Sequence, residues 1–382
     1  MSILFRQRGT ETAADLIPQR LDGRRATPSV SRDESFRHSV VWACLHLRAS
    51  LISSSPVDVY RTIGNRALEV DPPPVIVSPD GSPIGIVEWL YSTQIDLDST
   101  GNAFGIITAR DTAGLPRRID LVSADSVTVK VADGGIVEYR IGRRSYDPSN
   151  IWHERQFTRS GLPVGLSPIA HAAYSLSTGL SVHRFAADWF SGAAMPAAHL
   201  RNTAQTLDAE AATEVKARFK RTVSNGDVFV TGSDWEYNVL GGKASESSFV
   251  EASHLSAADL CRFLGVPGDM VDVNEQTGSV TYANITQRNL QLLIMHLGPS
   301  IRLRELALST LLTRPRYVKL NSDAVVLRMD PMTRAELNKT LLESNQRAPS
   351  EVREKDDLPP FTPEQVDEIL AFKPQAAAKE MP

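Results

Sequence analysis

The feature that most constrains this chain is a long helical stretch that directly follows a polar loop. Residues 283–312 are expected to form one helix, which at about 1.5 Å per residue would be roughly 45 Å long. Pro299 lies inside this stretch and is expected to kink the helix, because proline lacks the backbone N–H that continues the helical hydrogen bonds. The preceding residues 267–282 are polar and irregular. This element, together with the α/β units around it, predicts an α+β fold.

The first part of the chain has the pattern of a small mixed α/β unit. Apolar residues at helical spacing predict a helix over 36–54, and a strand is expected to follow it at 57–60. Ser82-Pro83 is expected to open a second helix that ends near Gly101-Asn102. The rest is mostly strands up to about residue 157, with members expected at 104–108, 126–131 and 137–141.

Two further helices flank a second small α/β pattern. Ser167 is expected to cap a helix that runs to about residue 191. Another helix over about 249–264 is expected to end at Gly265, because glycine is favoured in the left-handed conformation that closes a helix. Residues 197–245 between them are expected to hold a helix near 207–222 and strands at 228–230 and 235–240.

The end of the chain carries short elements. Strands are expected at 317–320 and 324–328. Thr333 with Glu336, and Thr362 with Gln365, have the spacing of capping boxes and predict two terminal helices.

Composition and charge limit the classes of function. The 382 residues are 42% hydrophobic and 23% charged, with a formal net charge of −4, which is typical of a globular protein. A protein that grips DNA statically is usually strongly basic, so the slight acidity and the absence of an evident basic patch disfavour that class. No stretch has the length of a signal peptide or a membrane span. Cys44 and Cys261 form no metal-binding motif and are expected to be reduced core residues.

Enzyme motifs are weak. The segment 165–169, Gly-Leu-Ser-Pro-Ile, resembles a hydrolase nucleophile elbow only in part, and Ser167 is better explained as a helix N-cap. The segment 241–245, Gly-Gly-Lys-Ala-Ser, lacks the first glycine and the final Ser or Thr position of a phosphate loop. The histidines have no metal-ligand spacing. We therefore expect no catalytic residue, no metal and no cofactor.

Several stretches resemble the portal proteins of HK97-like tailed phages. They follow one another in the family's order: 39–45 with 56–60, 101–104 (GNAF), 165–169 (GLSPI), 189–193, 264–267 (LGVP), 279–287, 297–301 (LGPSI) and 349–360. Each stretch is short, and the specificity comes from finding eight in order. Three positions depart from the family pattern, namely Thr286, Gly268 and Ser350, and they affect only local loop detail.

The resemblance implies a ring of twelve subunits around a channel for double-stranded DNA. It divides the chain into an arm (1–35), a wing (36–166 and 313–330), two stem helices (167–192 and 249–266) around a clip (193–248), a tunnel loop (267–282), a long kinked helix (283–312) and a short helical crown with a C-terminal tail (331–382). Implied partners are the terminase large subunit, the major capsid protein and a head–tail adaptor, without a membrane. The implied location is the portal vertex of the virion, after assembly in the host cytoplasm.

The tunnel loop is the implied DNA-facing site. Its candidate residues are polar or acidic, and the loop has no Lys or Arg: Asp272, Asn274, Glu275, Gln276, Thr277 and Ser279. Such side chains offer weak, reversible hydrogen bonds, and carboxylates repel the DNA backbone, so DNA would slide rather than adhere. Arg288, one turn into the next helix, is expected to contact phosphate or to form an ion pair between subunits. Pro299 is the expected kink.

Three alternatives remain from sequence. Another head–tail connector or minor head protein would also form rings. A serine hydrolase using Ser167 is less favoured by the motif. A static DNA-binding protein is disfavoured by the charge balance.

Overall fold

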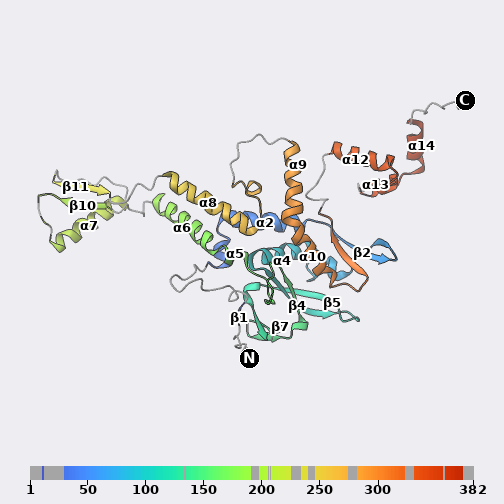
Figure 1. Ribbon diagram of the computed structural model, residues 1–382, viewed down its shortest axis with the longest axis horizontal. Helices are drawn as coiled ribbons and strands as arrows, with labels where there is room; N and C mark the ends of the chain where they lie inside the picture. Colours follow the sequence, from blue (N-terminus) through green and yellow to red (C-terminus); the bar gives the residue numbers. More distant parts are fainter. Residues whose placement is uncertain are drawn as a thin grey trace, which may run out of the picture. The chain divides into compact units, whose positions relative to one another are not determined.

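The computed structural model describes residues 11–12, 30–132, 135–190, 198–204, 206, 208–224, 234–239, 246–273, 282–322, 331–355 and 358–372. The chain divides into two compact units, Met1–Val326 and Leu327–Pro382. Each unit is described by itself, and Figure 1 shows the elements of both.

The first helices of the larger unit are α1 (Arg32–Ser35), α2 (Ser39–Ser53), α3 (Pro74–Val77) and α4 (Ile86–Thr100). The expected helix over 36–54 is confirmed by α2. The predicted start at Ser82-Pro83 is wrong, because the N–H of Gly85 bonds to the carbonyl of Ser82 and closes a turn there. Gly85 has φ 73° and separates this turn from α4. The predicted end is confirmed, since Gly101 closes α4 in the left-handed conformation at φ 75°.

Three antiparallel sheets build the rest of the α/β region. Their strand orders are β5-β4-β9, β1-β6-β7-β8 and β12-β2-β3. The strands are β1 (Glu11–Thr12), β2 (Val57–Ile63), β3 (Arg66–Val70), β4 (Asn102–Arg110), β5 (Pro116–Val122), β6 (Val127–Ala132), β7 (Gly135–Ile141), β8 (Arg144–Tyr146), β9 (Ile151–Arg155) and β12 (Arg316–Leu320). Two short 3₁₀ turns, η1 (Ala124–Ser126) and η2 (Pro148–Asn150), precede β6 and β9. The strands expected at 57–60, 104–108 and 137–141 lie within β2, β4 and β7. The strand expected at 126–131 is β6, which begins one residue later because Ser126 belongs to η1.

Strand β12 joins distant parts of the sequence. It pairs with β2, so that Val318 lies opposite Val59, and this confirms the strand expected at 317–320. The N–H of Val318 donates to Ser309 Oγ at 2.9 Å and that of Leu320 to Glu305 Oε1 at 3.1 Å. These bonds occupy N–H groups on the outer edge of β12, which an unpaired edge strand would expose. The strand expected at 324–328 lies outside the described residues.

The middle of the chain is helical. Ser167 caps α5 (Pro168–His171), which is followed after Ala172 by α6 (Ala173–Phe190). The single helix expected there is thus two consecutive helices. The small insert contains β10 (Ala198–Asn202), α7 (Ala209–Ser224) and β11 (Trp235–Val239), and β10 pairs with β11. Helix α8 (Glu246–Leu264) follows and ends at Gly265 as predicted. The strand expected at 228–230 lies outside the described residues.

The long helix is continuous but not uniform. It comprises α9 (Tyr282–Gln291), a π-helical turn η4 (Leu292–Leu297) and α10 (Gly298–Ser309). A short 3₁₀ turn η3 (Gly268–Val271) follows α8 at the start of the preceding loop. The helix is therefore close to its expected length, with an irregular turn just before Pro299.

Two buried clusters hold the larger unit together. One combines residues of α2, α5, α6 and α8, including Leu45, Leu176 and Leu260, each at most 1% exposed. The other lies in the sheets around Phe104, Val129 and Tyr139. The first cluster joins the two expected stem helices to α2.

The smaller unit has three helices in its described part: α12 (Pro331–Glu343), α13 (Pro349–Lys355) and α14 (Pro363–Phe372). The capping box of α14 is confirmed, because the N–H of Thr362 donates to Gln365 Oε1 at 3.1 Å and the N–H of Gln365 to Thr362 Oγ1 at 3.3 Å. The box predicted at Thr333 is wrong, since α12 already begins at Pro331, a residue favoured in the first turn.

Candidate channel-side loop and its anchors

The loop begins at a well-formed helix end. The N–H of Val266 donates to the carbonyl of Cys261 at 3.0 Å, and that of Gly265 donates to Arg262 at 3.3 Å. With Gly265 at φ 65°, this is a Schellman motif, which satisfies the last carbonyls of α8. Pro267 follows and prevents the helix from continuing. The chain therefore leaves α8 in a direction set by local backbone geometry.

The first residues of the loop are fixed against the protein. The N–H of Val273 donates to the carbonyl of Gly268 at 2.8 Å across η3. Met270, Val271 and Val273 pack against the helical core cluster. Asp272 lies between them in the left-handed conformation at φ 56°, which short polar residues tolerate better than bulky ones.

The remaining loop candidates lie outside the described residues. They are Asn274, Glu275, Gln276, Thr277 and Ser279. Their role as DNA-facing residues stays a prediction.

Arg288 bridges the two sides of the loop. Its Nη2 atom lies 2.6 Å from Asp269 Oδ2, and the two side chains are 39% and 24% exposed. The pair joins η3, at the start of the loop, to α9, which follows the loop. Sequence reasoning expected a phosphate or a neighbouring subunit as the partner of Arg288, whereas its partner here is in the same chain.

A second bridge lies one helical segment further on. His296 Nδ1 is 2.9 Å from the carbonyl of Gly265. Since a carbonyl only accepts, Nδ1 carries the proton in this bond. The bond joins the end of α8 to η4, so both ends of the loop are held by contacts within the chain.

Arg48 of α2 forms hydrogen bonds with the π-helical turn η4 and with the start of α10. Its Nη1 donates to the carbonyl of His296 at 2.9 Å and its Nη2 to Ser300 Oγ at 2.7 Å. The same guanidinium forms a bidentate pair with Asp98 of α4, at 3.0 and 3.1 Å. Both charged side chains are almost fully buried, at 4% and 2% exposure. This geometry satisfies both charges and connects α2, α4, η4 and α10.

A second buried pair holds α10 further along. Arg304 Nη1 lies 2.8 Å from Glu154 Oε2 of β9, and its Nη2 donates to Thr93 Oγ1 at 2.6 Å. Its guanidinium also lies over the ring of Trp89, 5.4 Å from the centroid. Burial raises the pKa of the Glu154 carboxyl above its ordinary value, while the neighbouring Arg304 opposes that shift. Helix α10 is therefore attached to the sheet region by charges that water does not reach.

The π-helical turn coincides with Gly298-Pro299. The N–H of Gly298 bonds to the carbonyl of Leu293, five residues back, instead of the usual four. A Cβ at Gly298 would lie 3.1 Å from that same oxygen, so a larger residue would crowd the turn. Pro299 has no N–H to restore the regular pattern. Single π turns occur often at functional positions in helices, and the predicted kink at Pro299 remains a prediction.

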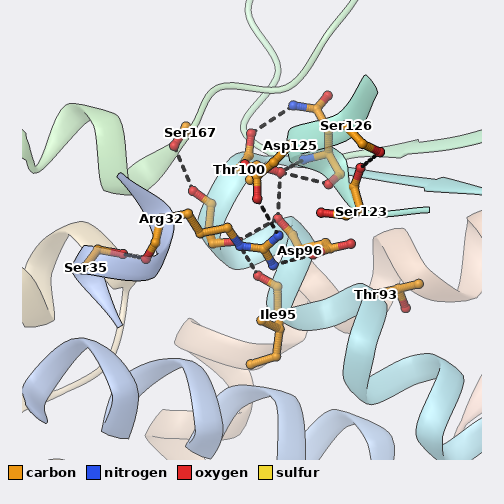
Figure 2. A network of polar contacts seen from close by, with 12 residues as sticks. Arg32, Ser35, Thr93, Ile95, Asp96, Thr100, Ser123, Asp125, Ser126 and Ser167 are labelled. Carbon is orange, nitrogen blue, oxygen red and sulfur yellow. Dashed lines mark hydrogen bonds and ion pairs between the residues drawn. The ribbon is translucent and has the colours of Figure 1, made fainter. Parts of the chain in front are cut away.

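Ser167 has the role of a cap. Its Oγ accepts from the N–H of Ala170 at 3.1 Å and donates to the carbonyl of Ser99 at 2.7 Å, so both partners are backbone atoms. Figure 2 shows it beside the ion pairs of Arg32 with Asp96 and Asp125. This arrangement attaches the starts of α1 and α5 to α4. In the described part of the chain no histidine is hydrogen-bonded to Ser167 Oγ, as a serine nucleophile needs; His171 Nδ1 lies 2.8 Å from the backbone carbonyl of Ser167 instead.

Other possible sites contribute little. Among the described residues there is no group of three or more His, Cys, Asp or Glu side chains that could hold a metal ion. No helix in the described ranges is long and apolar enough to cross a membrane. Cys44 and Cys261 are buried, with their sulfur atoms 4.0 Å apart, which confirms that they are core residues; that they are reduced stays an expectation.

Sequence reasoning missed the two buried arginine anchors. Arg48 lies at a core position of α2, on the same face as Cys44, Leu45 and Ile52. A charge inside an apolar helical stripe is a signal for a buried ion pair, and it was present in the sequence. Its partner Asp98 could not be found that way, because the pairing depends on how α2 packs against α4.

The comparisons with known proteins decide the family. The phage portal protein family matches residues 39–357. This chain belongs to that family. Phage portal proteins are structural rather than enzymatic, so the match agrees with the capping role of Ser167.

Relatives cover most of the portal chain. The portal protein of Enterobacteria phage HK97 is 26% identical over 364 residues, covering 90% of this chain and 84% of that protein. The probable portal protein of Streptomyces phage phiC31 is 24% identical over 360 residues, with 87% and 77% covered.

Solved structures agree on the fold. An HK97 family phage portal protein from Corynebacterium diphtheriae matches with TM-score 0.61 and 17% identity, over 80% of this chain and all of that one. A chain in the neck of a native gene transfer agent particle, computed with C12 symmetry, matches with TM-score 0.55 and 19% identity, over 87% and 96%. The α+β fold expected from the sequence is confirmed as the fold of these proteins.

Proposed function

We propose that this portal protein forms a ring of twelve copies at one vertex of the capsid, through which double-stranded DNA enters and leaves. Family membership over residues 39–357 supports the proposal. The twelvefold count is supported by the C12 symmetry used for the similar neck chain. We further propose that the ring assembles in the host cytoplasm and contacts the terminase large subunit, the major capsid protein and a head–tail adaptor.

The proposal assigns a role to each part of the chain. An arm (1–35) would precede the wing, which combines 36–166 with 313–330. Helices 167–192 and 249–266 would form the stem around a clip (193–248). Residues 267–282 would form the tunnel loop, 283–312 the kinked helix and 331–382 the crown and tail. The pairing of β12 with β2 supports the two-part wing, because it puts residues 316–320 into the same sheet as residues 57–70.

The observation that carries the proposed channel role is the way the loop is held. Its two ends are joined by the Asp269–Arg288 ion pair and by the hydrogen bond from His296 to Gly265. A loop with fixed ends and a polar middle can approach DNA without detaching from the helices. Its acidic side chains, Asp272 and Glu275, would repel phosphates and keep the duplex from adhering.

Electron microscopy of the purified protein tests the ring. Rings of about twelve copies with a central channel support the portal proposal. A uniform monomer or dimer at high concentration, in the presence of the scaffold that assembles the capsid, would refute it and favour another connector or a minor head protein.

DNA packaging tests the loop. Replacing Asp272 and Glu275 together with Lys is expected to slow DNA passage while rings still form, because Lys side chains bind phosphates. The matched control is Glu336→Lys, which reverses an exposed charge in α12. Equal packaging rates in the two variants would contradict the proposed contact with DNA.

We propose no catalytic role and no cofactor for the chain. Ser167→Ala is the direct test, because a hydrolase would lose activity toward ester substrates while the fold persists. Under the proposed portal function, the variant loses a helix cap, worth about 1 kcal/mol, and the hydrogen bond to the Ser99 carbonyl.

A further inference from the structure

One face of the sheet β12-β2-β3 carries arginines that are far apart in the sequence. The register puts Arg61 of β2 directly opposite Arg316 of β12, two positions from the buried pair Val59 and Val318. Side chains alternate between the faces of a strand, so both arginines lie on the same face as these valines. They extend that face beyond the core, where both are exposed.

The two arginines occupy the closest kind of cross-strand position. The N–H of Thr62 donates to the carbonyl of Pro315, so that neighbouring pair is the hydrogen-bonded one. Bonded and non-bonded pairs alternate in an antiparallel ladder, and the Cα atoms of a non-bonded pair are only about 4.5 Å apart. Like charges at such a position destabilise a sheet. The pair Arg61–Arg316 therefore needs a counter-charge.

The sheet itself does not supply that counter-charge. The third strand adds Arg66, opposite Ile63, to the same face. Both acids of the three strands, Asp58 and Glu69, lie on the other face by alternation. Within the described part of the chain, none of the three arginines has an ion-pair partner. Here the arginine face is defined as Arg61, Arg66 and Arg316.

We propose that the arginine face binds the phosphate backbone of double-stranded DNA without reading its sequence. Guanidinium groups pair with phosphate oxygens in bidentate fashion. This contact is separate from the tunnel loop and is not part of the proposed channel function. It rests on that proposed function only because a portal is exposed to duplex DNA.

The chemistry of the face favours DNA over an acidic protein. The exposed apolar side chains on this face are Ile63 and Leu68, 53% and 49% exposed, and there is no exposed aromatic residue among them. Arginines also anchor protein interfaces, but there they are surrounded by a larger apolar and aromatic core than these two side chains provide. Three guanidinium groups without ion-pair partners among the described residues, on one face of a small sheet, instead suit the evenly spaced phosphates of a DNA backbone.

A relaxed circular plasmid is the appropriate probe, because closed DNA cannot be threaded through a ring. Its affinity for the full-length protein is measured by filter binding between 50 and 200 mM KCl. The test variant is Arg61→Thr with Arg316→Thr, since threonine is a good strand residue. The control is Arg37→Ser with Arg159→Ser, which removes two other exposed arginines from the chain.

The salt dependence gives the expected size of the effect. Each phosphate contact contributes about 0.9 to the slope of log affinity against log salt, so the double variant should lose about 1.8 from that slope. Its affinity near 100 mM should fall by at least tenfold, while the control stays within twofold of the wild type. The single variant Arg66→Thr should lose about half as much slope.

Equal slopes for the double variant and the control would overturn the inference. So would competition by polyglutamate as effective as that by DNA at equal charge, because the face would then recognise an acidic polypeptide. Electron microscopy of the same samples keeps the two proposals apart. Rings that bind no circular DNA would refute the arginine face as a DNA site but leave the portal function standing. Arginine-dependent DNA binding by a protein that forms no rings would refute the portal function but leave the arginine face standing.

Discussion

Removing Arg48 should destabilise residues 292–300 of the long helix more than breaking an exposed ion pair destabilises its own surroundings. The variant Arg48→Met keeps much of the aliphatic volume and removes the guanidinium. It leaves Asp98, which is 2% exposed, as a buried charge with no counter-charge. Breaking a buried pair in this way costs about 3–5 kcal/mol. Two further hydrogen bonds, to Ser300 Oγ and the carbonyl of His296, are lost as well.

Hydrogen exchange measured by mass spectrometry is the suitable assay, because it reports on one segment of a chain with two units. A loss of about 3–5 kcal/mol corresponds to roughly a hundredfold to a few-thousandfold faster exchange over residues 292–300. The double variant Arg48→Met with Asp98→Leu should recover most of the protection. Replacing both charges of a buried pair by apolar residues is often neutral.

The matched control is Arg118→Met, which breaks the exposed pair with Asp120 at 2.8 Å, where the side chains are 55% and 43% exposed. Such a pair contributes roughly 0–1 kcal/mol. If Arg48→Met changed protection no more than Arg118→Met, the buried pair would not hold η4, and the reasoning would be refuted.

Two further predictions concern pH and backbone geometry. Burial lowers the pKa of His153 to about 3, so the unfolded chain binds a proton below about pH 6.5 that the folded one does not, and stability should fall by about 1.4 kcal/mol per unit between pH 6.5 and 3. The free energy of unfolding in urea should depend less on pH in His153→Gln than in the exposed control His254→Gln. Equal pH dependence in the two variants would contradict the lowered pKa of His153. Gly101→Ala should cost several kcal/mol more than Gly114→Ala, measured by thermal unfolding. Both have positive φ, but of the two only Gly101 has a backbone oxygen, that of Leu166, where an added Cβ would lie. Similar losses for the two variants would show that this collision is relieved.

Local signals in the sequence predicted local structure well. Ser167 as a cap, Gly265 as a helix end and the box at Thr362 each depend on a few neighbouring residues, and each is confirmed. Ser82-Pro83 has the same kind of local pattern and is wrong. There the turn that ends at Gly85 prevails over the capping preference. Gly85, at φ 73°, is not helical, so no helix can run through it from Ser82, and α4 begins only at Ile86.

The contacts that hold the candidate site could not be predicted in the same way. Arg48 and Asp98 are 50 residues apart, and the Arg304–Glu154 pair spans 150. The sequence showed no basic patch, yet the register of β2 with β12 brings Arg61 to Arg316. These pairings depend on strand register and helix packing, which residue spacing does not encode.

The position of β12 also has a consequence for synthesis. Its partner β2 leaves the ribosome with its pairing edge open, and more than 250 residues must follow before Leu320 exists to complete the sheet. At roughly 5–20 residues per second, this interval lasts on the order of tens of seconds. Asp58 and Arg61 place charges along this unpaired edge of β2, and such charges disfavour pairing with strands of other nascent chains. The sheet β12-β2-β3 is thus among the last parts of the larger unit to close, although its first strand lies near the N-terminus.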